Sequence, residues 1–197
     1  MPPPPLQIIP PGAVSFEPEG VDNMNIHKIT LRAFAVFALS LAAPAQAETL
    51  AFKASLDGKY GAEPTGSAAT GKAKIKVDTA RRRVSVDLTV DGITREALWD
   101  KLVAAPIGPV HFHKYATPAG GDSVLVLPLP YGADYQPTKR GFRVTMKDYD
   151  YEAGAKLLKS TLSFDDFVAA MRSGLVILNV HTDAFNPGEI SGRVQRR

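Results

Sequence analysis

The sequence predicts an all-β domain, an antiparallel sandwich or barrel with small helical insertions. Apolar and polar residues alternate with a period of two along several segments, turn-forming residues separate these segments, and only two stretches break the alternation over the length of a helix. An apolar fraction of 45% is sufficient for a hydrophobic core. The length of 197 residues indicates one domain with additional sequence at one end.

The first 47 residues are expected to lie outside this domain. Residues 1–23 hold a run of four prolines and no hydrophobic periodicity, which indicates disorder or an upstream extension of the reading frame. Residues 24–47 have the basic, apolar and small-residue regions of a signal peptide, with cleavage expected after Ala47. The apolar run at 33–43 is shorter than the roughly 20 residues that span a bilayer. The mature domain, residues 48–197, is therefore expected to be periplasmic or secreted, with no membrane span.

Composition excludes several kinds of site and partner for the mature domain. Because cysteine is absent, the core rather than disulfides must hold an exported fold together, and thiolate metal sites are excluded. Removal of the leader takes away two of the 23 basic and three of the 20 acidic residues, which leaves a net charge of +4. Basic residues cluster only at 81–83 and 196–197, without accompanying aromatic residues, so no nucleic-acid partner is expected.

Period-two alternation predicts the strands of the domain. A turn at 78–82 joins two of them into a hairpin with one buried and one solvated face. The prolines and glycines between Pro128 and Gly141 predict a long loop. The predicted strands are residues 50–56, 72–78, 83–90, 110–115, 123–129, 142–146, 175–181 and 189–194.

Two segments predict helices. Residues 94–102 break the alternation, with Thr94 as a candidate N-cap. Residues 163–173 carry the stronger signal, because Ser163 can cap the helix, an apolar stripe follows at helical spacing, and Gly174 can end it. That stripe is expected to pack against the sheet.

His111 and His113 are the clearest chemical feature. Residues i and i+2 of a strand project from the same face, so these two imidazoles are expected to lie side by side while Val110 and Phe112 face the other way. Imidazole nitrogens suit copper, zinc or nickel, and a third imidazole would complete a trigonal or open tetrahedral site. His181 is the third histidine of the mature chain, and we expect the three to share one metal. Asp183 and Glu189 flank His181 and are candidates for orienting an imidazole.

Residues 178–194, Leu-Asn-Val-His-Thr-Asp-Ala-Phe-Asn-Pro-Gly-Glu-Ile-Ser-Gly-Arg-Val, closely resemble the C-terminal motif of the CHRD family. This family is named for the repeat in chordin and occurs also in exported bacterial proteins. Further matching segments are residues 52–56, 67–73 and 110–113. The resemblance implies a Greek-key β-sandwich, immunoglobulin-like or superoxide-dismutase-like. Copper-zinc dismutases also place an H-x-H pair on a strand, which favours a copper site by analogy.

Three functions follow as hypotheses. The first is a non-enzymatic, exported metal-binding domain for metal handling, with copper favoured over zinc and His111, His113 and His181 as ligands. The second is a metal-free interaction or adhesion module that binds another exported protein. The third is a redox enzyme with dismutase-like chemistry. A stoichiometric metal assay separates the second hypothesis from the others, and turnover with superoxide separates the third from the first.

Overall fold

Ten antiparallel strands form a single sheet in the computed structural model, which describes residues 48–61, 64–118 and 120–197. The predicted signal peptide and the leader before it lie outside the described residues. The strands are β1 (Thr49–Asp57), β2 (Thr70–Asp78), β3 (Arg83–Asp91), β4 (Val110–Thr117), β5 (Gly120–Leu129), β6 (Tyr135–Pro137), β7 (Gly141–Asp150), β8 (Val176–Val180), β9 (Ile190–Arg193) and β10 (Gln195–Arg196). The helical elements are η1 (Arg95–Ala97), α1 (Asp100–Val103), α2 (Tyr151–Leu158) and α3 (Phe164–Arg172).

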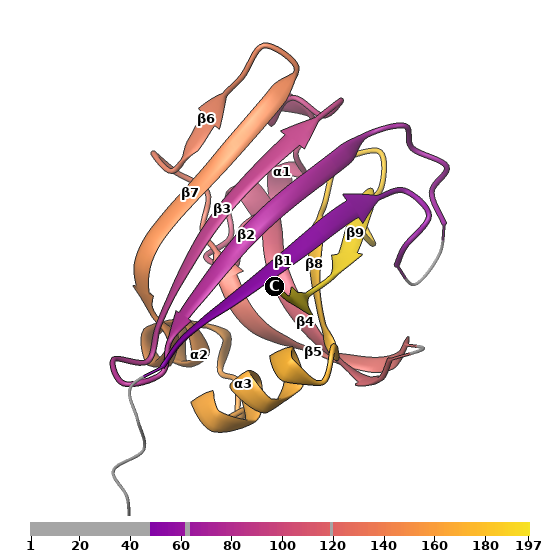
Figure 1. Ribbon diagram of the computed structural model, residues 1–197. Helices are drawn as coiled ribbons and strands as arrows, with labels where there is room; N and C mark the ends of the chain where they lie inside the picture. Colours follow the sequence, from indigo (N-terminus) through magenta and orange to yellow (C-terminus); the bar gives the residue numbers. More distant parts are fainter. Residues whose placement is uncertain (1–47, 62–63, 119) are drawn as a thin grey trace, which may run out of the picture. The chain divides into compact units, whose positions relative to one another are not determined.

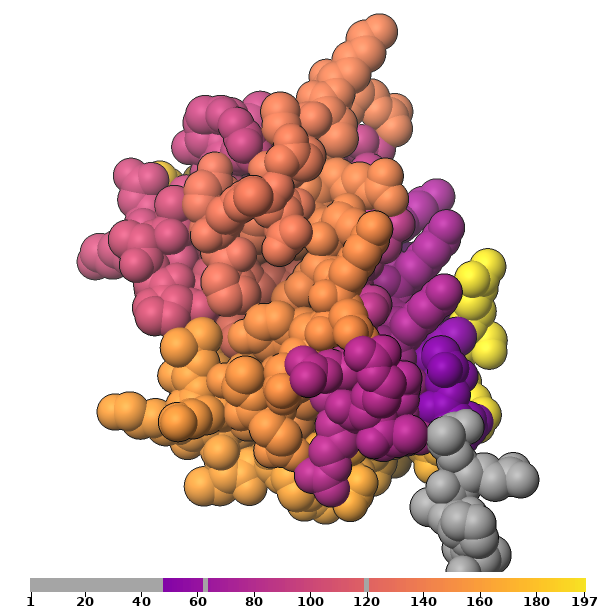
Figure 2. Space-filling view, turned by 90° about the vertical axis from the view of Figure 1, so that its left-hand side faces the viewer, coloured from indigo at the N-terminus to yellow at the C-terminus, as the bar shows by residue number. Residues whose placement is uncertain are grey.

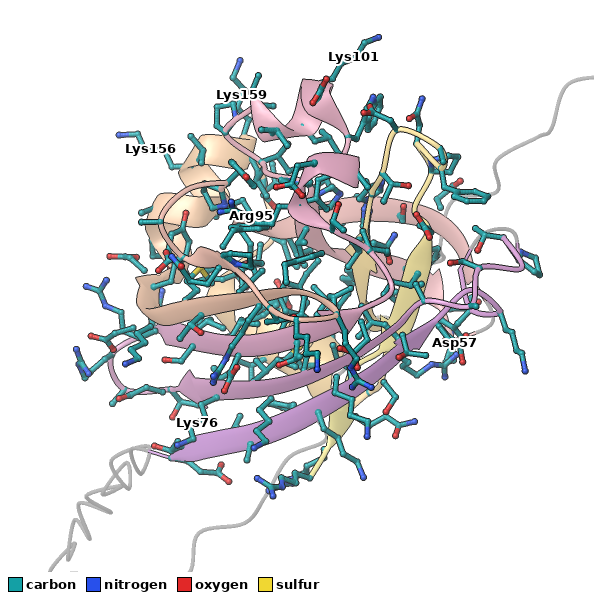
Figure 3. The ribbon with its side chains drawn as sticks, turned by 90° about the horizontal axis from the view of Figure 1, so that it is seen from above. Asp57, Lys76, Arg95, Lys101, Lys156 and Lys159 are labelled. Atoms are coloured by element: carbon teal, nitrogen blue, oxygen red, sulfur yellow. The ribbon has the colours of Figure 1, made fainter. Side chains whose placement is uncertain are left out.

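The sheet curls into two layers with the strand order β5-β4-β8-β9-β1-β2-β3-β7-β6, and β10 pairs with β1 off this path. Strands β1, β2, β3, β7 and β6 form the front layer of Figure 1, and β4, β5, β8 and β9 lie behind it. The layers join where Asp57 of β1 pairs with Ser191 of β9, and Figure 3 shows Asp57 at this end of β1. The predicted all-β, sandwich-like antiparallel fold is confirmed.

Alternation of side chains builds the core between the layers. Along β2, Ala73, Ile75 and Val77 are buried while the intervening lysines are exposed. Phe112 of β4 belongs to the same hydrophobic core, which it enters from the other layer, and it is fully buried. Burial of each large apolar side chain contributes about 1.5–3 kcal/mol, so the core can hold a cysteine-free domain together.

Helix α3 confirms the stronger helix prediction. The Ser163 hydroxyl accepts a hydrogen bond from the Asp166 amide at 3.1 Å, and Phe167 and Met171 are fully buried. Gly174 follows the helix with a φ of 67°, a left-handed conformation that glycine adopts without a steric penalty.

Helix α2 was not predicted from the sequence. The Asp150 carboxylate caps it by accepting hydrogen bonds from the amides of Glu152 and Ala153, and the Tyr151 ring stacks on Phe167 of α3 at 4.8 Å between centroids. The β2–β3 turn lies against these helices (Figure 2), with Arg82 in an ion pair with Glu152 at 2.7 Å. Tertiary packing thus stabilises a helix whose internal glycine, Gly154, weakens the local signal.

Two other predictions require correction. The segment expected to be a loop between Pro128 and Gly141 contains the short strand β6. The helix expected at 94–102 is broken into η1 and α1, and the Thr94 side chain makes no cap. The break occurs because Leu98 is fully buried and pairs with Thr182 in an isolated bridge, so contacts with a distant segment override the local helical pattern.

Candidate metal centre

Strand β4 presents His111 and His113 on the face opposite to the core. Across the β4–β8 pair, His111 lies opposite Asn179 and His113 opposite Ile177. Directly opposed residues of an antiparallel pair share a face. These four side chains, two from each strand, therefore lie on the same face of the sheet. Val110, Phe112, Leu178 and Val180 alternate with them and belong to the core. The expectation that the two histidines share a face of a strand is confirmed.

His181 follows directly after the end of β8. Its amide donates to the Pro109 carbonyl at 2.9 Å, and its own carbonyl accepts from the Trp99 amide at 3.1 Å. These bonds hold its backbone beside the segment that leads into β4. The alternation of β8 therefore continues for one residue and places the His181 side chain on the same face as Asn179.

The three imidazoles form a compact cluster. The His111 centroid lies 4.4 Å from that of His181 and 4.8 Å from that of His113, and the His113 and His181 centroids are 6.2 Å apart. One ring nitrogen from each residue can be chosen so that all three lie within 4.8 Å of one another. Nitrogens bind zinc at about 2.0–2.1 Å, so a single ion could be held between these rings with small adjustments.

Backbone carbonyls fix the orientation of two rings. His111 Nδ1 lies 2.9 Å from the Gly108 carbonyl oxygen, and His181 Nδ1 lies 2.8 Å from the Asn186 carbonyl oxygen. Each carbonyl requires an N–H donor, so both rings carry their proton on Nδ1 and keep a lone pair on Nε2. A histidine that binds a metal usually donates its other N–H in this way.

Several polar atoms of the cluster are buried without a hydrogen-bond partner. They are His181 Nε2, both ring nitrogens of His113 and the side-chain oxygen of Asn179. Buried polar groups are normally satisfied, and one that is not costs about 1–3 kcal/mol. A metal ion would take up the nitrogen lone pairs, so the residues present fit such an ion.

Burial keeps the cluster uncharged at neutral pH. It lowers the pKa of His111 from 6.5 to about 3, with the neighbouring His181 and His113 rings acting in the same direction. The pKa of His113 falls to about 4 for the same two reasons, burial first and then His181. Burial also lowers the pKa of His181, against the opposing effect of its bond to the Asn186 carbonyl. Neutral imidazoles are the form that coordinates metals.

Neither flanking carboxylate makes a hydrogen bond to an imidazole ring. Glu189 accepts hydrogen bonds from Ser67 and Thr182, and Asp183 accepts one from the Asp100 amide. The two carbonyls, at Gly108 and Asn186, take the expected role instead. No side-chain pattern in a sequence marks a backbone acceptor, which explains why they were missed.

Comparison with known protein families matches residues 52–194 to the CHRD domain. The chain belongs to the CHRD domain family. No curated protein and no solved structure gives a significant match to it. No helix in the described part of this CHRD domain is long and apolar enough to cross a membrane.

The C-terminal motif of the CHRD domain contributes to the site at several points. It supplies the His181 imidazole and the Asn186 carbonyl that accepts its hydrogen bond. It also supplies Glu189, whose amide closes the loop between β8 and β9 by donating to the Val180 carbonyl. The H-x-H pair on β4 supplies the other two rings. Segments far apart in the sequence thus meet at a cluster that could hold a metal ion.

Proposed function

We propose that this CHRD domain is an exported copper-binding protein that serves in metal handling, with His111, His113 and His181 as the ligands. The observation that carries the proposal is the approach of one ring nitrogen from each histidine to within 4.8 Å of the others, with nitrogens of His113 and His181 buried and without hydrogen-bond partners. A purely structural cluster would leave their desolvation uncompensated. The signal-peptide pattern of residues 24–47 supports export.

Copper is favoured over zinc by the donor set. All three donors are imidazoles, which suit both ions, and Cu²⁺ binds a given nitrogen site more tightly than Zn²⁺. Three protein ligands leave a coordination position open to water or to a group from a partner. An open position is what delivery of the ion to another protein requires.

The test is a competition titration of Cu(II) and Zn(II) against the mature domain and its single alanine variants at 111, 113 and 181. The wild type is expected to bind one Cu(II) per chain. Each variant should lose more than the roughly 10–100-fold that removal of an outer-sphere partner costs, because it loses a metal bond and part of the chelate. Tyr151→Phe is the control, since it removes a hydrogen bond from helix α2 to the Leu162 carbonyl.

The other outcomes have definite meanings. A wild-type domain that binds neither metal would contradict the proposal and favour the metal-free interaction module. Binding by His181→Ala at wild-type affinity would reduce the site to an adventitious pair on β4. Turnover of superoxide by the copper-loaded domain would favour the dismutase-like hypothesis. Export is tested separately by intact mass, which should correspond to a chain that begins at Glu48.

A further inference from the structure

A hydrogen-bond network centred on Glu189 closes the loop next to His181. One carboxylate oxygen of Glu189 accepts from the Ser67 hydroxyl at 2.7 Å, and the other accepts from the Thr182 hydroxyl at 2.7 Å. The Glu189 backbone carbonyl accepts from the Thr65 hydroxyl at 2.8 Å. All three donors are side chains, and two come from the β1–β2 connection.

The network brackets the segment that orients the His181 ring. Thr182 is the next residue after His181, and the Glu189 amide donates to the Val180 carbonyl at 2.7 Å, so residues 182–189 form a closed loop. The acceptor of His181 Nδ1, the Asn186 carbonyl, lies within this loop. The direction of the ring therefore depends on the conformation of the loop, which the Glu189 side chain holds at both ends.

We propose that Glu189 is a positioning residue for the metal centre: by bridging Ser67 and Thr182 it fixes the loop whose Asn186 carbonyl sets the His181 ring. This inference rests on the proposed function, in that it assigns a tuning residue to the same centre. It also makes the β1–β2 connection, which belongs to the other layer, part of the support of that centre.

The proposed action is geometric rather than electrostatic. The charge of Glu189 is not among the causes that shift the pKa of His181, which are burial and the bond to Asn186. Glutamine can preserve both bridges, because its oxygen accepts from one hydroxyl and its amide donates to the other, and a hydroxyl can act in either role. Alanine preserves neither bridge.

The experiment measures Cu(II) affinity by competition titration for the wild type, Glu189→Ala and Glu189→Gln. Glu189→Ala should weaken binding about 10–100-fold, as loss of an outer-sphere partner does, whereas Glu189→Gln should stay within about threefold of the wild type. Glu152→Ala is the matched control, since it removes an exposed carboxylate that pairs with Arg82 on the surface. If Glu189→Ala fails to fold, Thr182→Val removes one bridge at nearly constant shape and should show a smaller loss. The Phe185 amide then loses its bond to the Thr182 hydroxyl but keeps its bond to the Thr182 carbonyl.

A second readout does not require metal. Nitrogen-15 NMR of the metal-free domain reports the tautomer of each imidazole, and His181 should carry its proton on Nδ1 in the wild type and in Glu189→Gln but be mixed in Glu189→Ala. Unchanged affinity and an unchanged tautomer in Glu189→Ala would overturn the inference. Equal losses in the glutamine and alanine variants would also overturn it, in favour of a charge effect. A wild type that binds no copper, with the tautomer change still present, would overturn the proposed function alone.

Discussion

At the scale of single residues, His113 is the histidine of the cluster with neither ring nitrogen in a hydrogen bond. Both of its ring nitrogens are buried and have no hydrogen-bond partner, whereas His111 and His181 each donate to a carbonyl. Because an unpartnered buried polar atom costs free energy, we expect this ring to lower the stability of the metal-free domain. Residues that serve a binding site often lower the stability of the folded protein, and His113 would be an example.

His113→Leu should therefore raise the stability of the metal-free domain while it weakens metal binding. Leucine fills a similar volume without polar atoms, so the free energy of unfolding should rise by about 1 kcal/mol. Urea denaturation in the presence of a chelator measures this change, and copper titration measures the loss of affinity. A destabilised variant would show that His113 has a structural role instead.

The depressed pKa values predict how stability depends on pH. The metal-free folded domain keeps His111 and His113 neutral down to about pH 3 and 4, whereas the unfolded chain takes up these protons near pH 6.5. Stability is therefore fully present above pH 6.5 and falls as the pH drops toward 4, by up to about 1.4 kcal/mol per pH unit for each ring. Unfolding curves at pH 7 and pH 5 test this. His113→Leu should show a flatter dependence, and an equal slope in both proteins would contradict the assignment.

At the scale of elements, the turn before β4 orients the first of the three imidazoles, His111. Gly108 has a φ of 76°, and a Cβ atom there would overlap the Leu129 carbonyl. Its own carbonyl accepts the His111 hydrogen bond. Only glycine fits this place without moving the chain.

Gly108→Ala should cost about 2–4 kcal/mol of unfolding free energy and weaken copper binding, since the turn must shift away from β5. Gly132→Ala is the matched control, because no atom lies within 4 Å of its added Cβ, and it should remain within about 0.5 kcal/mol of the wild type. Chemical denaturation of both variants decides the matter. Similar stabilities would show that the turn is more adaptable than its geometry indicates.

The elements also show where sequence reasoning succeeds and where it stops. Alternation located β1, β2 and β3, and the cap at Ser163 located α3, because these signals are local. Helix α2 depends on packing between Tyr151 and Phe167, and the break at Leu98 depends on its bridge to Thr182. The three histidines could be named from spacing and family resemblance. The acceptor carbonyls could not, because only the folded backbone brings them to the rings.

At the scale of the whole domain, metal binding should stabilise the folded state by linking distant segments of the chain. The proposed ligands come from β4 and from the segment after β8, and the Glu189 bridges continue from that segment to the β1–β2 connection. An ion that binds only the folded state adds about 2.7 kcal/mol at a free concentration 100 times its Kd. This corresponds to a rise in Tm of roughly 5–10 °C for a domain of this size.

Thermal unfolding with Cu(II) and with a chelator measures the rise. The triple alanine variant at 111, 113 and 181 is the control and should melt at the same temperature in both conditions. An equal rise in the triple variant would place the stabilising ion elsewhere on the domain.

The core and the histidine cluster occupy opposite faces of the same two strands. Phe112 and Leu178 point into the sandwich, and their immediate neighbours His111, His113 and Asn179 point away from it. Selection can therefore act on one set of side chains while the other stays constant. In evolution, the side chains of the cluster can therefore be exchanged, lost or regained while the fold is kept. In design, positions 111, 113, 179 and 181 can be substituted to suit a different metal while the core-facing residues of each strand stay unchanged.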